Sequence, residues 1–258
     1  MGREDLDGRA IVVTGASRGI GRGLAIYLGR QGARVVCAAR TVQGAPSELP
    51  GTIDETAAEI RAAGGAAVAM RCDIGAPEDI SALVGGTVAE FGALDALVNN
   101  AMTPTHASLE ESTVEMWDDS MRINVRSLYL FTRAVTPVMR ARGGGSIVNI
   151  SSGAAAHEVS ALMPPGYVIY SVAKAALERF SSAAAPELRP LGVNINALRP
   201  GAVRTEHTTL EFGPDFDWSG WAEPEDVGPP VAYLAAQIDT DFTGRVLDVS
   251  GFGTTWGT

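Results

Sequence analysis

The sequence predicts an α/β domain in which a parallel sheet is covered by helices on both faces. Seven short runs rich in β-branched residues alternate with segments that carry apolar residues at helical spacing. Strands separated by helix-length segments cannot pair as hairpins, so they pair in parallel through right-handed crossovers. We find no composition boundary and no internal repeat along the 258 residues. We therefore expect one doubly wound domain over residues 1–258.

Each element follows from its local pattern. The strands are expected at 9–14, 33–38, 66–71, 94–98, 146–150, 193–198 and 245–248. The helices are expected at 20–31, 53–63, 77–91, 114–140, 170–188 and 224–236. Two further segments, 41–52 and 205–222, are rich in glycine and proline and are expected to be loops on the same domain.

Composition excludes several classes of protein. The chain has 30 acidic and 20 basic residues, a formal charge of −10, which argues against general binding to nucleic acid or anionic lipid. It shows no apolar leader and no run long enough to cross a membrane, so we expect a cytoplasmic protein. Cys37 and Cys72 lie in apolar strands and predict packing. His106, His157 and His207 stand alone, so no metal site is expected.

A glycine-rich turn joins the first strand to the first helix. Thr14-Gly15-Ala16-Ser17-Arg18-Gly19-Ile20-Gly21 lets the backbone approach a pyrophosphate and directs the first helical amides at it. Such turns also follow strands for steric reasons alone. Here the turn opens a strand-helix-strand unit, and Asp73 ends the third strand, where it can accept a hydrogen bond from an adenine amino group. This context predicts a dinucleotide site.

The end of the second strand bears on the choice of nicotinamide cofactor. An acidic residue there would bind the ribose 2′-hydroxyl of NAD(H), but this chain has Ala39 and Arg40. Arg40 and Arg18 could together hold a 2′-phosphate with charge-assisted hydrogen bonds. The alternative is that both are solvated surface arginines. We expect a preference for NADP(H), with NAD(H) as the alternative.

Tyr170 and Lys174 have the i,i+4 spacing that places both side chains on one face of a helix. A phenol has a pKa near 10, and a neighbouring cation favours phenolate, which lowers the pKa toward the range useful for acid-base catalysis. Ser151 and Ser152 close a strand upstream, at the edge where doubly wound sheets bind ligands. Asn124 interrupts an otherwise apolar helix and must find buried partners.

Taken together, these motifs resemble the short-chain dehydrogenase/reductase family, from Ile11 to Gly251. The resemblance implies a Rossmann-type fold and NAD(P)-dependent oxidoreduction of CH–OH and C=O groups. It also implies that Tyr170 is the general acid or base, that Lys174 holds the nicotinamide ribose and lowers the tyrosine pKa, and that Ser152 binds the substrate oxygen. Asn124 would anchor a water in a proton relay to Lys174. Ser151 is the less favoured serine.

The resemblance further implies the residues that contact the cofactor. Asn99-Asn100-Ala101 would form a wall beside the adenine, and residues 200–205 would lie beneath the nicotinamide. There, Val203 would offer backbone bonds to the carboxamide and Thr205 a hydroxyl. The predicted cofactor residues are Gly15, Ser17, Arg18, Gly19, Ile20, Gly21, Arg40, Asp73, Ile74, Asn100, Ala101, Tyr170, Lys174, Pro200, Gly201, Val203 and Thr205.

The sequence departs from the family pattern on the substrate side. Met102 stands where the family usually has glycine, and extra residues in 157–166 lengthen the segment between Ser152 and Tyr170. This segment and 205–222 are rich in apolar side chains, which suits a hydrophobic alcohol or ketone of terpenoid, steroid-like or fatty type. The alternative is that these side chains pack on each other or on another subunit. The predicted substrate residues are Met102, Ser152, Leu162, Met163, Tyr167, Phe212 and Trp218.

The sequence thus predicts an NADP(H)-dependent oxidoreductase that transfers hydride between a nicotinamide and a carbonyl or secondary alcohol of a small molecule. Two alternatives stay open: an NAD(H)-dependent alcohol or hydroxysteroid-type dehydrogenase of the same family, and a non-catalytic nucleotide-binding sensor. The family resemblance implies a homotetramer, with a homodimer as the alternative, paired through the helices at 114–140 and 170–188.

Overall fold

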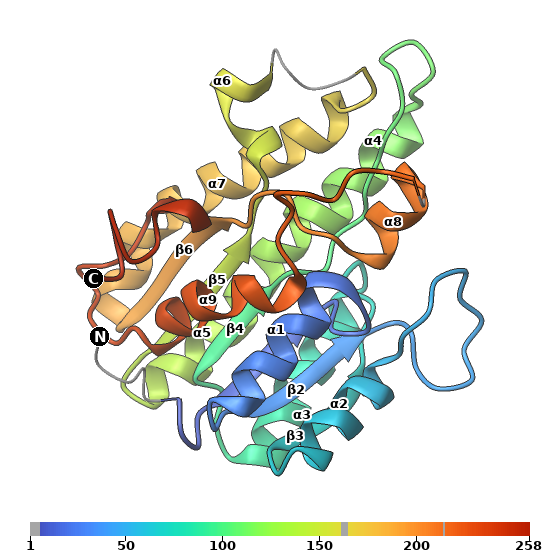
Figure 1. The fold of residues 1–258 in the computed structure, drawn as a ribbon. Helices are drawn as coiled ribbons and strands as arrows, with labels where there is room; N and C mark the ends of the chain where they lie inside the picture. The colour runs from blue at the N-terminus through green and yellow to red at the C-terminus, as the bar shows by residue number, and fades with distance from the viewer. Residues whose placement is uncertain (1–5, 161–164, 214) are drawn as a thin grey trace.

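A computed structural model describes residues 6–160, 165–213 and 215–258 and contains one sheet of seven parallel strands. The strand order is β3-β2-β1-β4-β5-β6-β7 (Figure 1). The strands are β1 Ala10–Thr14, β2 Arg34–Ala39, β3 Ala66–Arg71, β4 Ala96–Asn99, β5 Gly145–Ile150, β6 Val193–Arg199 and β7 Val246–Asp248. The strand order reverses between β1 and β4. The carboxyl ends of these two strands therefore border a crevice where doubly wound sheets bind ligands. The predicted fold class is confirmed.

The helices form one layer on each face of the sheet. They are α1 Gly19–Arg30, α2 Ile53–Ala62, α3 Pro77–Phe91, α4 Val114–Met121, α5 Ser127–Ala141, α6 His157–Ser160, α7 Val168–Leu188, α8 Glu206–Phe212 and α9 Gly228–Ala236. One face carries α1, α2 and α9, and the other carries α3, α5 and α7 (Figure 1). A separate apolar core lies under each layer.

The central strands are buried on both sides. All five residues of β1 are buried. Ile11 and Val13 join the core with Leu24 and Leu28 of α1, while Val12 faces the core that contains Phe131 of α5. An apolar run without alternation therefore forms a strand because both of its faces meet a helix layer.

Three local features differ from expectation. The helix expected at 114–140 is divided by a five-residue π-helical turn, Arg122–Arg126, which contains Asn124. The segment 205–222 is not entirely loop, because Thr205 caps the helix α8 through a capping box with Thr208. The inserted segment contains the short helix α6. Leu162 and Met163 lie outside the described residues.

Cys37 and Cys72 are both free and buried. Burial raises the pKa of each thiol to about 12. At neutral pH each thiol therefore stays protonated, which is consistent with a packing role. Within the described ranges, no helix has the length and apolarity needed to cross a membrane.

Candidate active site

The glycine turn is held closely by the segment that follows β4. The Thr14 hydroxyl oxygen accepts from the amides of Asn100, at 3.0 Å, and Ala101, at 3.1 Å. The Asn100 side-chain amide donates back to the Thr14 carbonyl at 3.0 Å. Gly15 has a φ of +69°, and a Cβ on Gly21 would lie 2.2 Å from the Gly15 carbonyl oxygen. The turn therefore requires glycine at both positions.

The backbone amides in the first turn of α1 find no capping side chain at the N-cap residue. This residue, Arg18, makes no side-chain capping bond, and no acidic residue lies in the first turn of the helix. The Gly19 amide instead donates to Oε2 of Glu206, at 2.8 Å, from the start of α8. Ser17 is buried just before this turn, and Ile20 is half-buried. The positive end of the helix macrodipole therefore points at the crevice.

The two predicted phosphate-binding arginines differ in their surroundings. The Arg18 guanidinium donates to the Ser47 hydroxyl, at 2.9 Å, and to the Gly51 carbonyl, at 3.1 Å. It also reaches the hydroxyl of Thr41, the neighbour of Arg40, at 3.3 Å. The Arg18 Nε is buried and has no hydrogen-bond partner among the described residues. Arg40 is exposed at the end of β2. The structure thus brings Arg18 to the strand end that carries Arg40.

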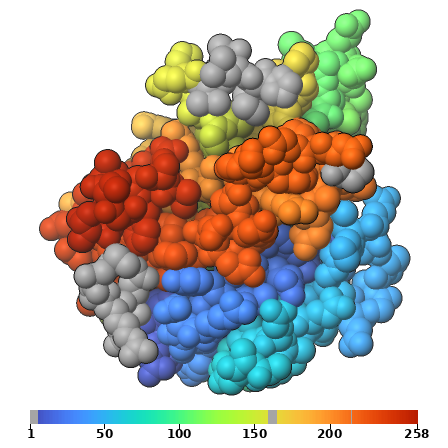
Figure 2. Space-filling view, in the orientation of Figure 1, coloured from blue at the N-terminus to red at the C-terminus, as the bar shows by residue number. Residues whose placement is uncertain are grey.

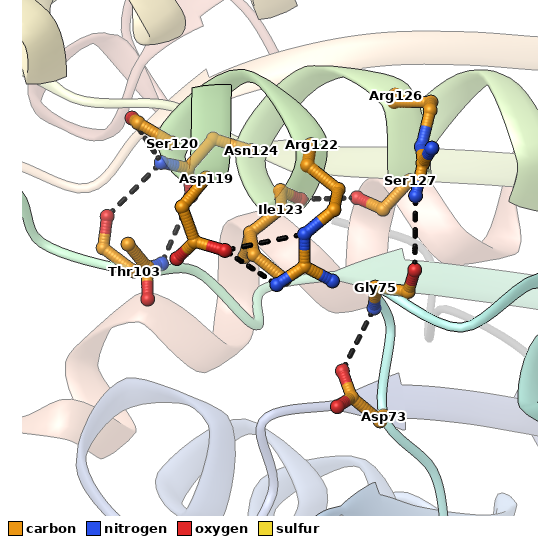
Figure 3. A network of polar contacts seen from close by, with 10 residues as sticks. All are labelled: Asp73, Gly75, Thr103, Asp119, Ser120, Arg122, Ile123, Asn124, Arg126 and Ser127. Atoms are coloured by element: carbon orange, nitrogen blue, oxygen red, sulfur yellow. Dashed lines mark hydrogen bonds and ion pairs between the residues drawn. The ribbon is translucent and has the colours of Figure 1, made fainter. Parts of the chain in front are cut away.

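Asp73 lies at the other side of the proposed adenine region. One of its carboxylate oxygens accepts from the Gly75 amide at 2.8 Å, and Arg126 donates to the Gly75 carbonyl at 3.0 Å (Figure 3). Ile74 is buried beside it. The Asp73 carboxylate is therefore held in place by its own turn.

Tyr170 and Lys174 lie on one face of α7, as their spacing predicts. The Lys174 ammonium lies 5.8 Å from the centre of the Tyr170 ring and donates to the Ile150 carbonyl, at 2.8 Å, at the end of β5. Ser152 caps the turn that follows β5 and forms a hydrogen bond with Tyr170. The structure therefore brings Ser152, Tyr170 and Lys174 together at the carboxyl edge of the sheet.

The pKa values of the pair are governed by burial. Burial raises the pKa of Tyr170, and the hydrogen bond with Ser152 opposes that rise. Burial lowers the pKa of Lys174 to about 8, against the opposing charge of Glu178. The expected lowering of the tyrosine pKa by its lysine neighbour is therefore wrong for this structure, because desolvation of the phenolate outweighs every other influence.

Asn124 is buried in the π-helical turn, and both oxygen and nitrogen of its side-chain amide are hydrogen-bonded (Figure 3). Its Oδ1 accepts from the Thr103 amide at 2.9 Å, and its Nδ2 donates to the Thr103 carbonyl and to the Ser120 hydroxyl, each at 3.0 Å. Asn124 therefore ties the segment after β4 to α4, which contains Ser120.

Sequence reasoning missed Glu178, one turn beyond Lys174 on α7. Its carboxylate accepts from the Ser151 hydroxyl at 2.7 Å and binds the Arg199 guanidinium in a bidentate pair at 2.7 and 2.8 Å. This network joins β5, α7 and β6, and it occupies Ser151, which leaves Ser152 as the serine facing Tyr170. The i,i+4,i+8 series from Tyr170 through Lys174 to Glu178 was the available signal.

The segment predicted to lie beneath the nicotinamide follows β6. Pro200 and Val203 are buried, and Gly201 has a φ of +76°. Val203 forms an isolated bridge with Ala222, which fixes the backbone before α8. Thr205 then caps α8, and its methyl carbon would lie 3.3 Å from a Cβ on Gly19. This segment therefore packs directly on the glycine turn.

A second polar group, which we call the rim, lies next to Tyr170 and consists of His106, Tyr167, His207 and Glu211. The rings of His106 and Tyr167 stack with centres 4.3 Å apart, and His106 meets the Tyr170 ring edge-on. Glu211 of α8 lies 3.4 Å from the Tyr167 hydroxyl and 3.5 Å from the His106 Nδ1. Burial is the main reason that the pKa of His106 is lowered. His207 and Glu211 have the i,i+4 spacing of neighbours on α8, but no local motif predicts that His106 and Tyr167 meet them.

The other predicted substrate residues lie at the surface. Met102 is 39% exposed and Phe212 is 42% exposed. Phe212 stacks on Phe216 with ring centres 4.6 Å apart, and Trp218 meets both rings edge-on. The aromatic side chains of this segment therefore contact each other extensively, which was the alternative interpretation of the sequence.

Comparison with known proteins agrees with this geometry. The model of the short chain dehydrogenase family matches residues 9–212. An uncharacterized oxidoreductase from Methylorubrum extorquens is 36% identical over 256 residues, covering 95% of this chain and 98% of that one. The human dehydrogenase/reductase SDR family member 4 is 32% identical over 260 residues, covering 96% of this chain and 88% of that protein.

Solved structures of related proteins have the same overall fold. A dehydrogenase/reductase from Sinorhizobium meliloti superimposes with a TM-score of 0.80 at 32% identity and covers 95% of both chains. A protein from Beutenbergia cavernae, solved with NADP at low occupancy, superimposes with a TM-score of 0.82 at 32% identity and covers 96% of this chain and 97% of that one. The chain belongs to the short-chain dehydrogenase family and is an NAD(P)-dependent oxidoreductase.

Proposed function

We propose that the protein prefers NADP(H) and interconverts a carbonyl and a secondary alcohol on a hydrophobic small molecule. The observation that carries this proposal is the placement of Tyr170, bonded to Ser152 and next to buried Lys174, at the sheet edge that also holds the glycine turn. We further propose that one domain carries both the cofactor site and the substrate site.

The residues around the glycine turn fit a dinucleotide. The first amides of α1 lack a cap within their own helix, a Cβ on Gly15 would lie 2.8 Å from Asn100 Nδ2, and the buried Arg18 Nε lacks a partner among the described residues. Uncapped helical amides with a nearby buried cationic donor suit a phosphate-bearing ligand. We propose that Gly15, Ser17, Gly19, Ile20 and Gly21 hold the diphosphate.

The remaining cofactor contacts are proposed from the places of these residues on α7 and after strands β3, β4 and β6. Asp73, Ile74, Asn100 and Ala101 would flank the adenine. Lys174, Pro200, Gly201, Val203 and Thr205 would hold the nicotinamide riboside, with Tyr170 beside it. The bound cofactor supplies or accepts a hydride at its nicotinamide.

The chain's own groups would manage the substrate oxygen. Ser152 donates a hydrogen bond to that oxygen and orients it toward the Tyr170 hydroxyl. Tyr170 gives its proton to the oxygen in reduction and takes it back in oxidation. Lys174, held on the Ile150 carbonyl at 2.8 Å, stabilises the phenolate that remains. Asn124 positions the segment after β4 and, with an anchored water, would complete a path for the proton to Lys174.

The preference for NADP(H) is supported by Arg18 and Arg40 and by the lack of an acidic residue after β2. The parent is expected to show a higher kcat/KM with NADPH than with NADH. Arg40→Asp should reverse this order, because a carboxylate repels the 2′-phosphate and binds a free 2′-hydroxyl. Arg30→Asp, an equal charge change at the exposed far end of α1, should leave the order unchanged. Equal use of both cofactors by the parent, or a preference for NADH, would overturn the assignment.

The substrate class is supported by the exposed apolar side chains of Met102 and Phe212. A panel of ketones and alcohols, assayed with both cofactors in parallel, should give turnover with hydrophobic secondary alcohols or ketones. Turnover of sugars or charged acids alone would contradict this class. Binding of NADPH without turnover of any compound would favour a nucleotide sensor.

We also propose a homotetramer or homodimer paired through α4, α5 and α7. Large apolar side chains are exposed on these helices, including Val114 and Trp117 of α4, Tyr129 of α5 and Val172 of α7. Light scattering of the purified protein should give a mass of two or four chains, and a monomer at micromolar concentration would contradict the pairing.

A further inference from the structure

Glu206 occupies an unusual position for an acidic residue, given the ligand proposed for this site. Its Oε2 accepts the Gly19 amide at 2.8 Å, although the two residues are 187 positions apart in the chain. Figure 2 shows the orange segment that carries α8 lying across the front of the molecule, above the blue N-terminal part. A carboxylate therefore sits against the helix end that we assign to the cofactor diphosphate.

The cations of this region do not neutralise Glu206. Arg18 is bonded to the 41–51 segment, Arg22 pairs with Glu59, and Arg204 lies over the Trp218 ring. Among the described residues, no lysine or arginine forms an ion pair with Glu206. Its charge is compensated instead by the amide end of α1, whose own sequence supplies no acidic residue in the first turn.

The position of Glu206 is fixed by its surroundings. It is the first residue of α8, whose N-cap Thr205 accepts from the Thr208 amide and donates its own amide to the Thr208 hydroxyl at 2.8 Å. Thr205 also packs on the glycine turn, since it lies within contact distance of the Cβ position of Gly19. The carboxylate is therefore delivered to Gly19 by a capped helix and not by a free loop.

A cofactor diphosphate at the same amides would bring two negative charges next to this carboxylate. We propose that Glu206 competes with the cofactor diphosphate for the first amides of α1 and thereby lowers the affinity for the cofactor. The inference rests on the proposed function, because it takes the glycine turn as the diphosphate site. Glu206 acts here as an affinity-determining residue, and the diphosphate binds once the side chain has left Gly19.

The test measures binding directly, without turnover. Dissociation constants of NADPH, ADP and adenosine are compared by isothermal titration calorimetry for the parent, Glu206→Gln and Glu206→Ala. Both variants should bind NADPH and ADP about tenfold more tightly, because a repulsive charge at the helix end is removed. Adenosine, which carries no phosphate, should bind all three proteins equally. Thermal unfolding of each variant confirms that it is folded.

Glu48→Gln is the matched control. Glu48 is exposed and lines the same cavity of about 680 Å³ as Gly19 and Glu206, so its replacement makes the same change in net charge near the site. It should change the NADPH affinity by less than twofold, because solvent and salt screen an exposed charge.

Two results would overturn the inference while leaving the proposed function intact. One is an NADPH dissociation constant within twofold of the parent in both Glu206 variants. The other is equal tightening by Glu48→Gln, which would assign the effect to net charge alone. Failure of the parent and of every variant to bind NADPH or NADH would instead overturn the proposed function, and the inference with it.

Discussion

In the floor of the candidate site, which we define as Ser151, Lys174, Glu178 and Arg199, polar side chains are bonded at 2.7–2.8 Å. In the rim, defined above, Glu211 meets its neighbours at 3.4–4.0 Å. The floor joins two central strands to α7, whereas the rim joins α8 to loops at the surface. Short buried bonds hold catalytic groups in one geometry, and looser contacts permit adjustment. We infer that the floor serves the chemistry and that the rim influences substrate choice.

The largest expected effect belongs to Tyr170, which the floor supports. Tyr170→Phe removes the proton donor and keeps the ring, so kcat should fall by about 10²–10⁴-fold, the usual contribution of general acid-base catalysis. The measurement is steady-state turnover of the best ketone found in the panel. NADPH affinity should stay within a few-fold of the parent, which shows that the site is intact. Residual activity above about one hundredth of the parent would refute the assigned role.

Glu178→Gln tests whether the floor is held by its buried ion pair. The change leaves the Arg199 guanidinium without its bidentate partner, which should lower the free energy of unfolding by about 3 kcal/mol. Urea denaturation monitored by circular dichroism measures the loss. Glu187→Gln, an exposed position on the same helix, is the control and should cost less than about 0.5 kcal/mol. Equal effects of the two substitutions would mean that the network contributes nothing specific.

The burial of Lys174 predicts a pH dependence of stability. Its pKa is lowered to about 8, so between pH 8 and about 10 the unfolded chain carries a proton on this group that the folded chain has lost. Stability contributed by this group therefore rises with pH across that window, and the cost of burying the charge is fully present below pH 8. Burial raises the pKa of Tyr170 above its ordinary value, so the phenol is protonated at neutral pH, which is the form that donates a proton in reduction.

Lys174→Met isolates this effect. Relative to the variant, the parent should gain up to about 2 kcal/mol in unfolding free energy between pH 8 and pH 10. Urea denaturation of both proteins at pH 7, 8, 9 and 10 gives the difference. A difference that does not change with pH would show that Lys174 is not charged and buried in the folded state as described.

The smallest effect on stability is expected in the rim. Glu211→Gln weakens long, partly exposed contacts, so the free energy of unfolding should fall by less than about 1 kcal/mol. The ratio of kcat/KM between two substrates of the panel should shift by at least about threefold, because α8 changes its contact with the segment beside Tyr170. A stability loss equal to that of Glu178→Gln, or an unchanged substrate ranking, would break the contrast between floor and rim.

Most of the fold could be predicted from the sequence because its signals are local. Strand runs and helical periodicity placed the strands and the principal helices, including the fully buried β1. Two local departures were harder to predict. The π-helical turn contains Asn124, whose side chain bonds Thr103 in another segment, and α8 begins at a cap on Thr205 inside a stretch rich in loop-forming residues.

The features of the candidate site likewise fall into two groups, those predicted by local spacing and those decided by packing. Spacing alone put Tyr170 and Lys174 on one face of α7, because helix geometry relates residues i and i+4. Packing decided that Ser151 bonds Glu178, that Arg18 turns toward the 41–51 segment, and that burial raises the pKa of Tyr170. These properties depend on which distant segments meet and on how much water they exclude.

The sequence by itself therefore predicted the alternating strands and helices of the parallel sheet, the glycine turn and the Tyr–Lys spacing, since each of these signals lies within a short stretch of chain. Only the tertiary structure decided the Glu178–Arg199 pair, the Glu206–Gly19 contact and the grouping of the rim. The physical reason is distance along the chain. A contact between residues 21 or 187 positions apart depends on how whole elements pack, and no local periodicity encodes that packing.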